Sequence, residues 1–389
     1  MSPMTPRERV LAAIHHEEPD RVPLIVGVDL TTGIMMQACR RLKDLLGFQA
    51  LERFLYDWPE LDAANPDAAV LLRLGSDGRG VQDRFPARTY ARNRSRPPGT
   101  PYFDDWGVGQ EELAPGEYTP SIHPLREAET LEALQTYPNW PDMDDPTRFA
   151  HVRDQAAVLA ADNQFAIFGS PWLLPPFERA CQLQGMDAFL LNLAARPDLA
   201  RALLERIASL CKRHMSHFLP ALGDSVDVIV IADDLGTQDS LLMSPKMYRQ
   251  VLKPIHADWF GFIKSHTHAK LFFHSDGDVF PLIDDLVEIG VDILNPIQTS
   301  AGKMADLATL KKRYRKNLAF CGAIDTHRVL PRGTPAGVRE EVRRVIGLLG
   351  RGGGYMVASV HSIMNDVPGE NILTMCEAVE EFGHYPLRV

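Results

Sequence analysis

The feature that most constrains the fold of this chain is a regular alternation, from about residue 150 onward, of short apolar runs with amphipathic helical stretches. The runs are FAIFG from 165, VDVIVIADD from 226, KLFFHSDG from 270, DILNPIQ from 292, LAFCGAID from 318 and GYMVASVH from 354, and VPLIV from 22 adds another near the start. Runs of this length, apolar on both faces and separated by helices, are typical of repeated strand-helix units that form a parallel sheet.

The helical stretches between the runs have the expected periodicity. In ARPDLARALLERIASLCKRHMSHFL, from 195, apolar residues recur at three and four positions, and PAGVREEVRRVIGLLG, from 335, ends at a glycine. The number of units is close to eight, and VPLIVGVDLTTG lacks the GxGxxG pattern of dinucleotide-binding open sheets. We therefore predict an α/β fold, a (β/α)8 TIM barrel that occupies residues 1–389 as a single domain. Residues 80–146, rich in Pro, Gly and Asp, form an elaborated loop region before residue 150.

Composition excludes several classes of protein. A chain of 389 residues with 45% hydrophobic content can bury a large core, yet no stretch approaches a membrane span, and the N-terminus has no apolar signal core. The five cysteines show no CxxC pairing, so we expect reduced thiols and a cytoplasmic protein. A net charge of -10 argues against nucleic-acid binding. The one basic segment, RFPARTYARNRSR from 84, is interpreted as a solvated surface or, alternatively, as a clamp for an anionic substrate.

Polar residues follow the apolar runs again and again. Barrel enzymes carry their active sites on the loops after the carboxyl ends of the strands. The residues found there are Asp233, Asp234, His274, Asp276, Asn295, Gln298, Asp325, Ser359 and His361. Any one of them could be a helix cap or a turn former, but five strands carry such residues at the same end, which predicts a functional site.

His274 and Asp276 stand two residues apart, so their side chains can point to the same side of a strand end, and His361 follows the last run. Two histidines and a carboxylate that converge can form a divalent-metal site with open positions or a general acid/base pair. A hydrogen-bonded network that lines a substrate pocket without metal is the third possibility. Asp278 follows Gly277, where the chain can turn, and is expected to cap the next helix and face solvent.

Five separated blocks resemble the uroporphyrinogen decarboxylase superfamily, including its corrinoid-dependent methyltransferase branch. They are TPRERVLAAIHHEEPDRVP, DDLGTQDSLLMSPKMYRQVLKP, FFHSDGDVFPLIDDLVEIGVDILNPIQ, CGAIDTHRVLPRGTP and GGGYMVASVHSIMNDVPGENI, in the family's order and over nearly the full chain. The resemblance implies a (β/α)8 barrel, in agreement with the strand count, and His361 falls where the family has a histidine in the last strand-loop.

The chain departs from both branches of that superfamily. Uroporphyrinogen decarboxylases carry an arginine-rich RQAGRY-like segment soon after the first strand, whereas VGVDLTTGIMMQ holds no arginine to meet the carboxylates of the tetrapyrrole. The methyltransferase branch holds zinc with an HxC pair and a later cysteine. Here the pair reads His274-Ser275-Asp276, and no cysteine stands near His361. A His/Asp/His set is a harder site that suits zinc first, or iron or manganese.

The resemblance implies a methyltransferase-like enzyme that moves a methyl group between a small methylated or methoxylated compound and a corrinoid protein or related acceptor. We assign His274, Asp276, His361 and Asp233 to the catalytic set, the first three also as metal ligands, and Asp234, Asn295, Gln298, Asp325 and Ser359 to substrate binding. The alternatives are a decarboxylase, in which His361 donates the proton and Asp233 or Asp234 stabilises positive charge, and a non-catalytic barrel that binds a tetrapyrrole or corrinoid. Family members are often homodimers.

Overall fold

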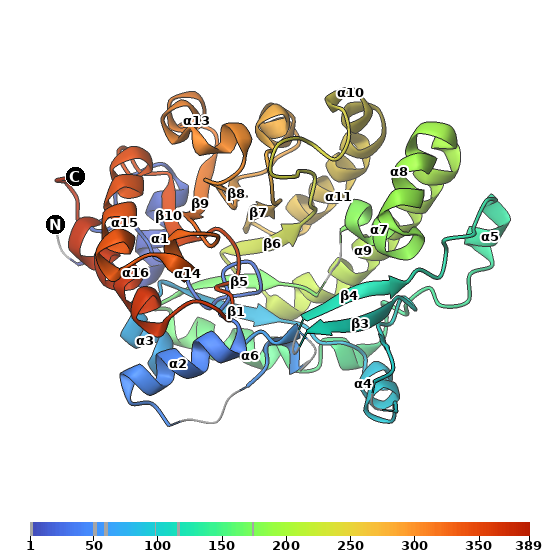
Figure 1. Cartoon of the computed structure of the whole chain (residues 1–389), viewed down its shortest axis with the longest axis horizontal. Helices are drawn as coiled ribbons and strands as arrows, with labels where there is room; N and C mark the ends of the chain where they lie inside the picture. The colour runs from blue at the N-terminus through green and yellow to red at the C-terminus, as the bar shows by residue number, and fades with distance from the viewer. Residues whose placement is uncertain (1–2, 50–52, 58–60, 98, 115–116, 173–174) are drawn as a thin grey trace.

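A parallel sheet of seven strands curls through the centre of the molecule (Figure 1). The computed structural model describes residues 3–49, 53–57, 61–97, 99–114, 117–172 and 175–389. In spatial order the strands are β1 (Gly78–Gln82), β5 (Ala166–Ser170), β6 (Val228–Ala232), β7 (Lys270–His274), β8 (Ile293–Asn295), β9 (Ala319–Ile324) and β10 (Tyr355–Ser359). Every neighbouring pair is parallel, so all the carboxyl ends lie at one end of the sheet.

The segment 22–26 lies between the two edges of this sheet and closes it. On one side Ile25 N donates to Val357 O of β10 (2.8 Å). On the other side Asp77 N donates to Leu24 O (2.8 Å), and Leu24 N donates to Asp77 Oδ2 (2.7 Å), directly before β1. The seven strands and this segment therefore complete a (β/α)8 barrel, as the alternation of strands and helices predicts.

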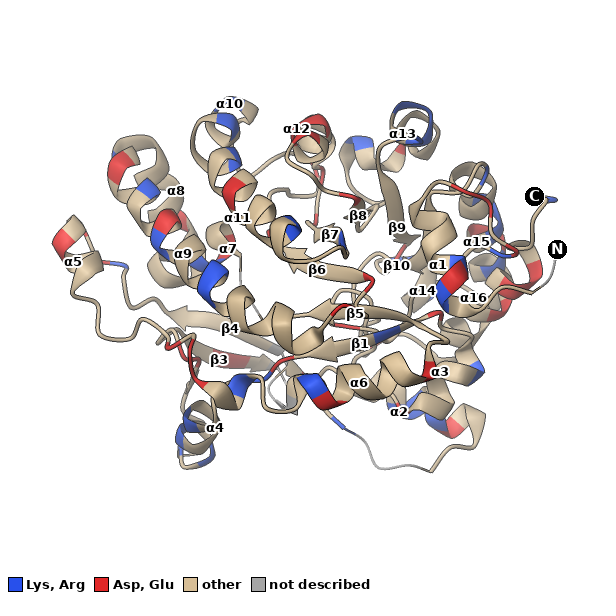
Figure 2. Ribbon diagram, turned by 180° about the vertical axis from the view of Figure 1, so that it is seen from behind, with Lys and Arg blue, Asp and Glu red and all other residues tan. Residues whose placement is uncertain are grey.

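Helices surround the sheet, and Lys and Arg gather on outer helices such as α4, α9 and α13 (Figure 2). Their bounds are α1 (Pro6–Ile14), α2 (Met36–Leu46), α3 (Ala68–Leu74), α4 (Ala87–Arg94), α5 (Leu131–Gln135), α6 (Val152–Asp162), α7 (Pro176–Gln184), α8 (Met186–Ala195), α9 (Pro197–Leu222), α10 (Pro245–Met247), α11 (Lys253–His266), α12 (Ile283–Glu288), α13 (Leu307–Tyr314), α14 (Val329–Arg332), α15 (Pro335–Leu349) and α16 (Gly369–Phe382). Among the described residues, no helix combines the length and apolarity needed to cross a membrane.

The barrel interior is filled by alternate residues of the strands and is covered at the amino end by α1. Val10, Ala13 and Ile14 of α1 belong to the same buried cluster as Phe168, Val230, Phe272, Ile293 and Met356. The helix begins with a capping box, in which Thr5 accepts from Glu8 N and Glu8 accepts from Thr5 N. Phe272 and Ile293 are buried, which confirms the prediction that they are core positions.

The sequence reading missed strand β1, because GRGVQ has neither an apolar run nor a β-branched majority. Packing explains its composition. A Cβ at Gly80 would lie 1.9 Å from Val28 O, and one at Gly78 would lie 2.9 Å from the ring of Phe168. Arg79 projects to the other face, where its guanidinium lies 3.6 Å from the centroid of the Phe165 ring. Glycine is therefore required where Val28 and Phe168 approach the backbone of β1.

The region before residue 150 is more ordered than the predicted loop region. It contains a second, antiparallel sheet of β2 (Tyr102–Phe103), β3 (Gly109–Ala114) and β4 (Glu117–Ile122). The basic segment from Arg84 forms α4, on which Arg88, Arg92 and Arg94 are exposed.

Replacing Phe272 with Ala tests the barrel core. Phe272 is 1% exposed and packs edge-on against Phe168, with ring centroids 6.4 Å apart. We expect the substitution to lower the free energy of unfolding by about 3 to 5 kcal/mol, because it leaves a cavity inside a closed barrel. Urea denaturation measures the loss. Leu191→Ala, at a position that is 66% exposed, should cost less than about 0.5 kcal/mol, and equal losses in the two variants would contradict this assignment of the core.

Candidate functional site

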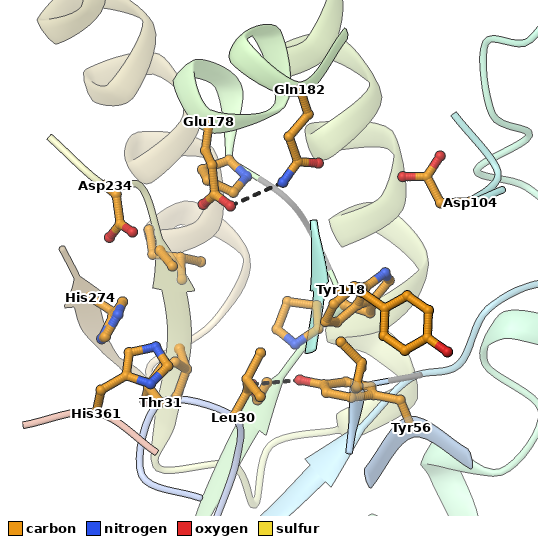
Figure 3. Close-up of a pocket in the computed structure, with 18 of the residues that line it drawn as sticks. Leu30, Thr31, Tyr56, Asp104, Tyr118, Glu178, Gln182, Asp234, His274 and His361 are labelled. Carbon is orange, nitrogen blue, oxygen red and sulfur yellow. Dashed lines mark hydrogen bonds between the residues drawn. The ribbon is translucent and has the colours of Figure 1, made fainter. Parts of the chain in front are cut away.

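A cavity of about 580 Å³ opens at the carboxyl ends of the strands. One side of it carries Asp234, His274 and His361, and the opposite side carries Tyr56 and Tyr118, with Glu178 and Gln182 of α7 above (Figure 3). The lining residues are Leu30, Thr31, Met35, Tyr56, Leu61, Phe85, Tyr102, Asp104, Gln110, Tyr118, Pro120, Ser170, Pro171, Trp172, Pro175, Glu178, Gln182, Val230, Ile231, Ala232, Asp234, His274, His361 and Met364. None of these described lining residues is Lys or Arg.

Hydrogen bonds fix both the ring orientation and the tautomer of His274, the last residue of β7. Its Nδ1 lies 2.5 Å from Asn295 Oδ1, and the amide nitrogen of Asn295 donates to Cys321 O (3.2 Å). The amide oxygen therefore faces the ring, so that Nδ1 carries the proton and Nε2 faces the cavity side. Burial lowers the pKa of His274, but Asp276 and Asp234 outweigh this effect and raise the pKa overall.

Asp276 lies between the two histidines. Its Oδ2 is 3.8 Å from His274 Nε2 and 4.0 Å from His361 Nε2, and the histidine ring centroids are 5.2 Å apart. One ligand atom from each residue lies within 4.8 Å of the other two. The structure thus brings together the trio that the sequence singles out.

The trio matches a metal site in composition and spacing, but one contact opposes it. Ser362 N donates to His361 Nδ1 (2.7 Å), so a neutral His361 ring carries its proton on Nε2, the atom that would have to bind the metal. Only His274 and Asp276 then offer free ligand atoms, whereas catalytic zinc sites use three protein ligands. As arranged, the residues do not fit the ion, and the trio has the form of a hydrogen-bonding and proton-transfer set.

Glu178 is a site residue that the sequence analysis missed. It lies on α7, lines the cavity and accepts from Gln182 Nε2 (3.2 Å). Burial raises its pKa, and Asp234 and Asp233 add to the effect, so that the pKa reaches about 8. Burial and Asp276 likewise raise the pKa of Asp234, against the opposing effect of His274. The signal available in the sequence was weak, because Glu178 belongs to an ordinary amphipathic helix.

Asp233 and Asp234 are adjacent in the chain, but their side chains point in different directions and have different partners. Asp234 lines the cavity and accepts from Asp276 N (2.9 Å). Asp233 points to the helix side, where its carboxylate accepts from Phe177 N (3.0 Å), Glu178 N (2.9 Å) and His256 Nε2 (2.9 Å). Asp233 therefore caps the start of α7 and positions Glu178 without lining the cavity.

Four other polar residues lie away from the cavity lining. Gln298 is buried and accepts from Gly277 N (2.6 Å), and Asp325 accepts from His327 N (2.5 Å) and Arg328 N (3.0 Å) ahead of α14. Ser359 is buried with no hydrogen-bond partner for its hydroxyl. Asp278 accepts from Phe280 N (3.3 Å), as a helix cap does, but the prediction that it faces solvent is wrong, because it is 7% exposed and also accepts from Lys303 N (3.1 Å).

The far side of the cavity is aromatic. Tyr56 and Phe85 pack against Trp172, with ring centroids 5.0 and 5.2 Å apart, and Tyr102 packs on Tyr118 at 5.2 Å. Tyr102 and Tyr118 come from the antiparallel sheet, so the region before residue 150 supplies most of these rings, and Trp172 follows β5 of the barrel.

Comparison with known proteins agrees with the fold. The family model for uroporphyrinogen decarboxylase (URO-D) matches residues 107–382. Uroporphyrinogen decarboxylase of Coxiella burnetii (strain RSA 493 / Nine Mile phase I) is 23% identical over 274 residues, 67% of this chain and 69% of that protein. The enzyme of Legionella pneumophila (strain Lens) is 26% identical over 293 residues, 72% and 75% of the two chains. A methyltransferase from Methanosarcina mazei has the same fold, with a TM-score of 0.65, 19% identity, and coverage of 97% of this chain and 99% of that one.

Replacing Glu178 with Gln tests the burial of its carboxyl group. Glu178 keeps its proton up to about pH 8 in the folded chain, whereas the ordinary value is 4.5. The protonated form therefore favours folding below pH 4.5, and this contribution is lost as the pH rises through about 8. We expect Glu178→Gln to raise the Tm above that of the unchanged protein by on the order of 2 to 8 °C at about pH 9, and to change it little at about pH 4.

Thermal melts over this pH range measure the effect. Glu340 is a suitable control because Arg343 lowers its pKa, so Glu340→Gln should not gain stability at high pH. A Tm difference for Glu178→Gln that does not depend on pH would rule out a raised pKa at this position.

Metal content tests the hydrogen bond to His361. We expect protein purified without a histidine tag to hold well below one equivalent of zinc, iron or manganese, before and after incubation with each ion, because Nε2 of His361 is protonated. Elemental analysis after dialysis gives the amount. Retention of one equivalent that is lost in both His274→Ala and His361→Ala would show instead that the trio binds metal.

Proposed function

The chain belongs to the uroporphyrinogen decarboxylase (URO-D) family, and we propose that this member transfers a methyl group between a small methylated compound and a corrinoid protein or a related acceptor. The observation that carries the proposal is the charge of the cavity wall, on which no described lining residue is Lys or Arg. A tetrapyrrole with many carboxylates needs several guanidinium or ammonium partners, and this wall offers acids, aromatic rings and two histidines instead. The exposed arginines of α4 do not line the cavity.

Methyl transfer sets requirements that the cavity can meet. The bond between the methyl carbon and its oxygen or nitrogen breaks, the electron pair stays with the leaving atom, and the pair for the new bond comes from the acceptor. A leaving oxygen needs a proton, which the Nε2–H of His361 or the carboxyl group of Glu178 can hold at the cavity. A leaving ammonium nitrogen becomes a neutral amine and needs none. A reduced corrinoid supplies a nucleophilic cobalt for such a transfer.

Within the proposal, His274 and Asp276 act as a positioning pair. Asn295 fixes the His274 ring, and Asp234 fixes the backbone of Asp276, so the pair presents a polar surface of constant shape to the substrate. His361 offers no free ligand atom for a metal ion, and its Nε2–H is available as a proton donor instead.

Decarboxylation of a small carboxylated compound is the second candidate, and one observation favours it. The raised pKa of His274 stabilises an imidazolium at the cavity, which could pair with a substrate carboxylate, while His361 Nε2–H could protonate the carbon that loses carbon dioxide.

Incubation with reduced cobalamin distinguishes the two candidates. Free cob(I)alamin replaces the acceptor, and the donors are tetramethylammonium, dimethylamine and the methyl ether guaiacol. We expect the cobalamin spectrum to change to that of methylcobalamin with at least one donor, and Asp234→Asn to slow the change by about tenfold to a hundredfold. In a parallel reaction, uroporphyrinogen should yield little or no coproporphyrinogen. Robust decarboxylation without methyl transfer to cobalamin would overturn the proposal.

A further inference from the structure

The polar end of the cavity carries an excess of acid. Glu178 and Asp234 line it, and Asp276 adjoins them through its hydrogen bond to Asp234. One carboxylate oxygen of Asp276 is buried and has no hydrogen-bond partner. The guanidinium beside the cavity belongs to Arg179, which is fully buried, pairs with Asp104 and lies 4.9 Å from the Trp106 ring centroid. Arg179 therefore neutralises Asp104. Glu178, Asp234 and Asp276 outnumber the one histidine whose pKa is raised at the cavity, His274, which lies 3.8 Å from Asp276.

The other end of the cavity presents aromatic faces and edges. Trp172 lies between Tyr56 and Phe85, with interplanar angles of 60° and 52°, and Tyr118 meets Tyr102 at 64°. All five of these rings line the cavity. The faces of aromatic rings attract cations, most strongly where water is excluded, and aromatic rings beside carboxylates are the usual recognition site for quaternary ammonium groups.

We propose that the cavity binds an organic cation, a methylated ammonium compound, with its charged nitrogen between the carboxylates of Glu178 and Asp234 and its methyl groups toward the rings of Trp172 and Tyr56. The role of this cation as a methyl donor rests on the proposed function, whereas its binding does not. The excess of acids favours a cation over an anion at this end of the cavity. Glu178 keeps its proton up to about pH 8 when no cation is bound, and the positive charge of the ligand favours its ionised form, so that binding releases this proton.

With this substrate, the bonds, electrons and charges of the methyl transfer are all accounted for. The carbon–nitrogen bond breaks, its electron pair stays on nitrogen, and the ammonium group becomes a neutral amine. The methyl carbon receives its new electron pair from the acceptor, a reduced corrinoid, and no proton has to be supplied. Loss of the positive charge removes the attraction to Glu178 and Asp234, which favours release of the product amine.

Binding of choline to the full chain tests this inference. The matched neutral probe is 3,3-dimethyl-1-butanol, called dimethylbutanol below. A tert-butyl group in it replaces the trimethylammonium group of choline, so the two probes differ in charge and have nearly the same shape. We expect isothermal titration calorimetry to show choline bound at least about tenfold more tightly than the neutral probe. Acetate should show no binding in the cavity. Equal affinity for choline and dimethylbutanol would overturn the proposal.

Variants locate the binding. Glu178→Gln and Asp234→Asn should each weaken choline binding by about tenfold while leaving the affinity for dimethylbutanol unchanged, and Trp172→Ala should weaken binding of both probes. Asp239→Asn is the matched control, because Asp239 is exposed on the same loop after β6 and does not line the cavity. Choline affinity that is unaffected by Glu178→Gln and by Asp234→Asn would place the cation elsewhere and refute the inference.

The two proposals fail in different ways. Choline that binds as described but gives no methylcobalamin refutes the transfer activity and leaves the cation site intact. Methyl transfer from guaiacol alone, together with equal binding of choline and dimethylbutanol, supports the activity and refutes the cation site.

Discussion

The site depends on the closure of the barrel at the segment 22–26. Asp77 holds this seam, because its buried carboxylate accepts from Leu24 N and pairs with Arg9 at 2.5 Å and Arg21 at 3.2 Å. Burial raises the pKa of Asp77, and the two guanidinium groups oppose that rise. Without the seam, β10 and β1 would be free edges, and the loop that carries His361 would have no fixed position opposite the chain that follows Val26.

That following chain contains an acid that the sequence analysis overlooked. Asp29 is 1% exposed, and its Oδ1 accepts from the backbone and hydroxyl groups of Thr31 and Thr32 at 2.9 to 3.1 Å. Its charge favours the protonated form of both His274 and His361. The pKa of His274 is raised overall, whereas burial outweighs the acids at His361 and lowers its pKa. The closing segment supplies backbone hydrogen bonds to the barrel, and the chain directly after it contributes to the electrostatics of the cavity.

Much of this arrangement follows from sequence periodicity. Six of the expected strands are present. Alternate residues of a strand point to the same face, so once one interior residue of a strand is known, the others follow. By this rule His274 and Asp234 point to the inside of the barrel and Asp233 points to the helices. The sequence did not indicate which alternate residues of each strand point into the barrel, because both faces of these strands are apolar. Glu178 and the aromatic wall could not be predicted, since their positions depend on contacts between distant segments. The proton position on His361 depends on one backbone N–H group, which no residue pattern encodes.

The two sides of the cavity have separate structural origins. Asp234, His274 and His361 stand at the ends of barrel strands and Glu178 stands on α7, whereas Tyr102, Tyr118 and Asp104 belong to the small antiparallel sheet outside the barrel or its connections. Trp172, after β5, is the ring that the barrel itself supplies. Mutations in that sheet can reshape the aromatic side while the strand ends, the seam at Asp77 and the His274–Asn295 contact stay as they are. Evolution can therefore exchange one ligand for another by altering this appended module, with the barrel inherited unchanged and little of its folding free energy put at risk.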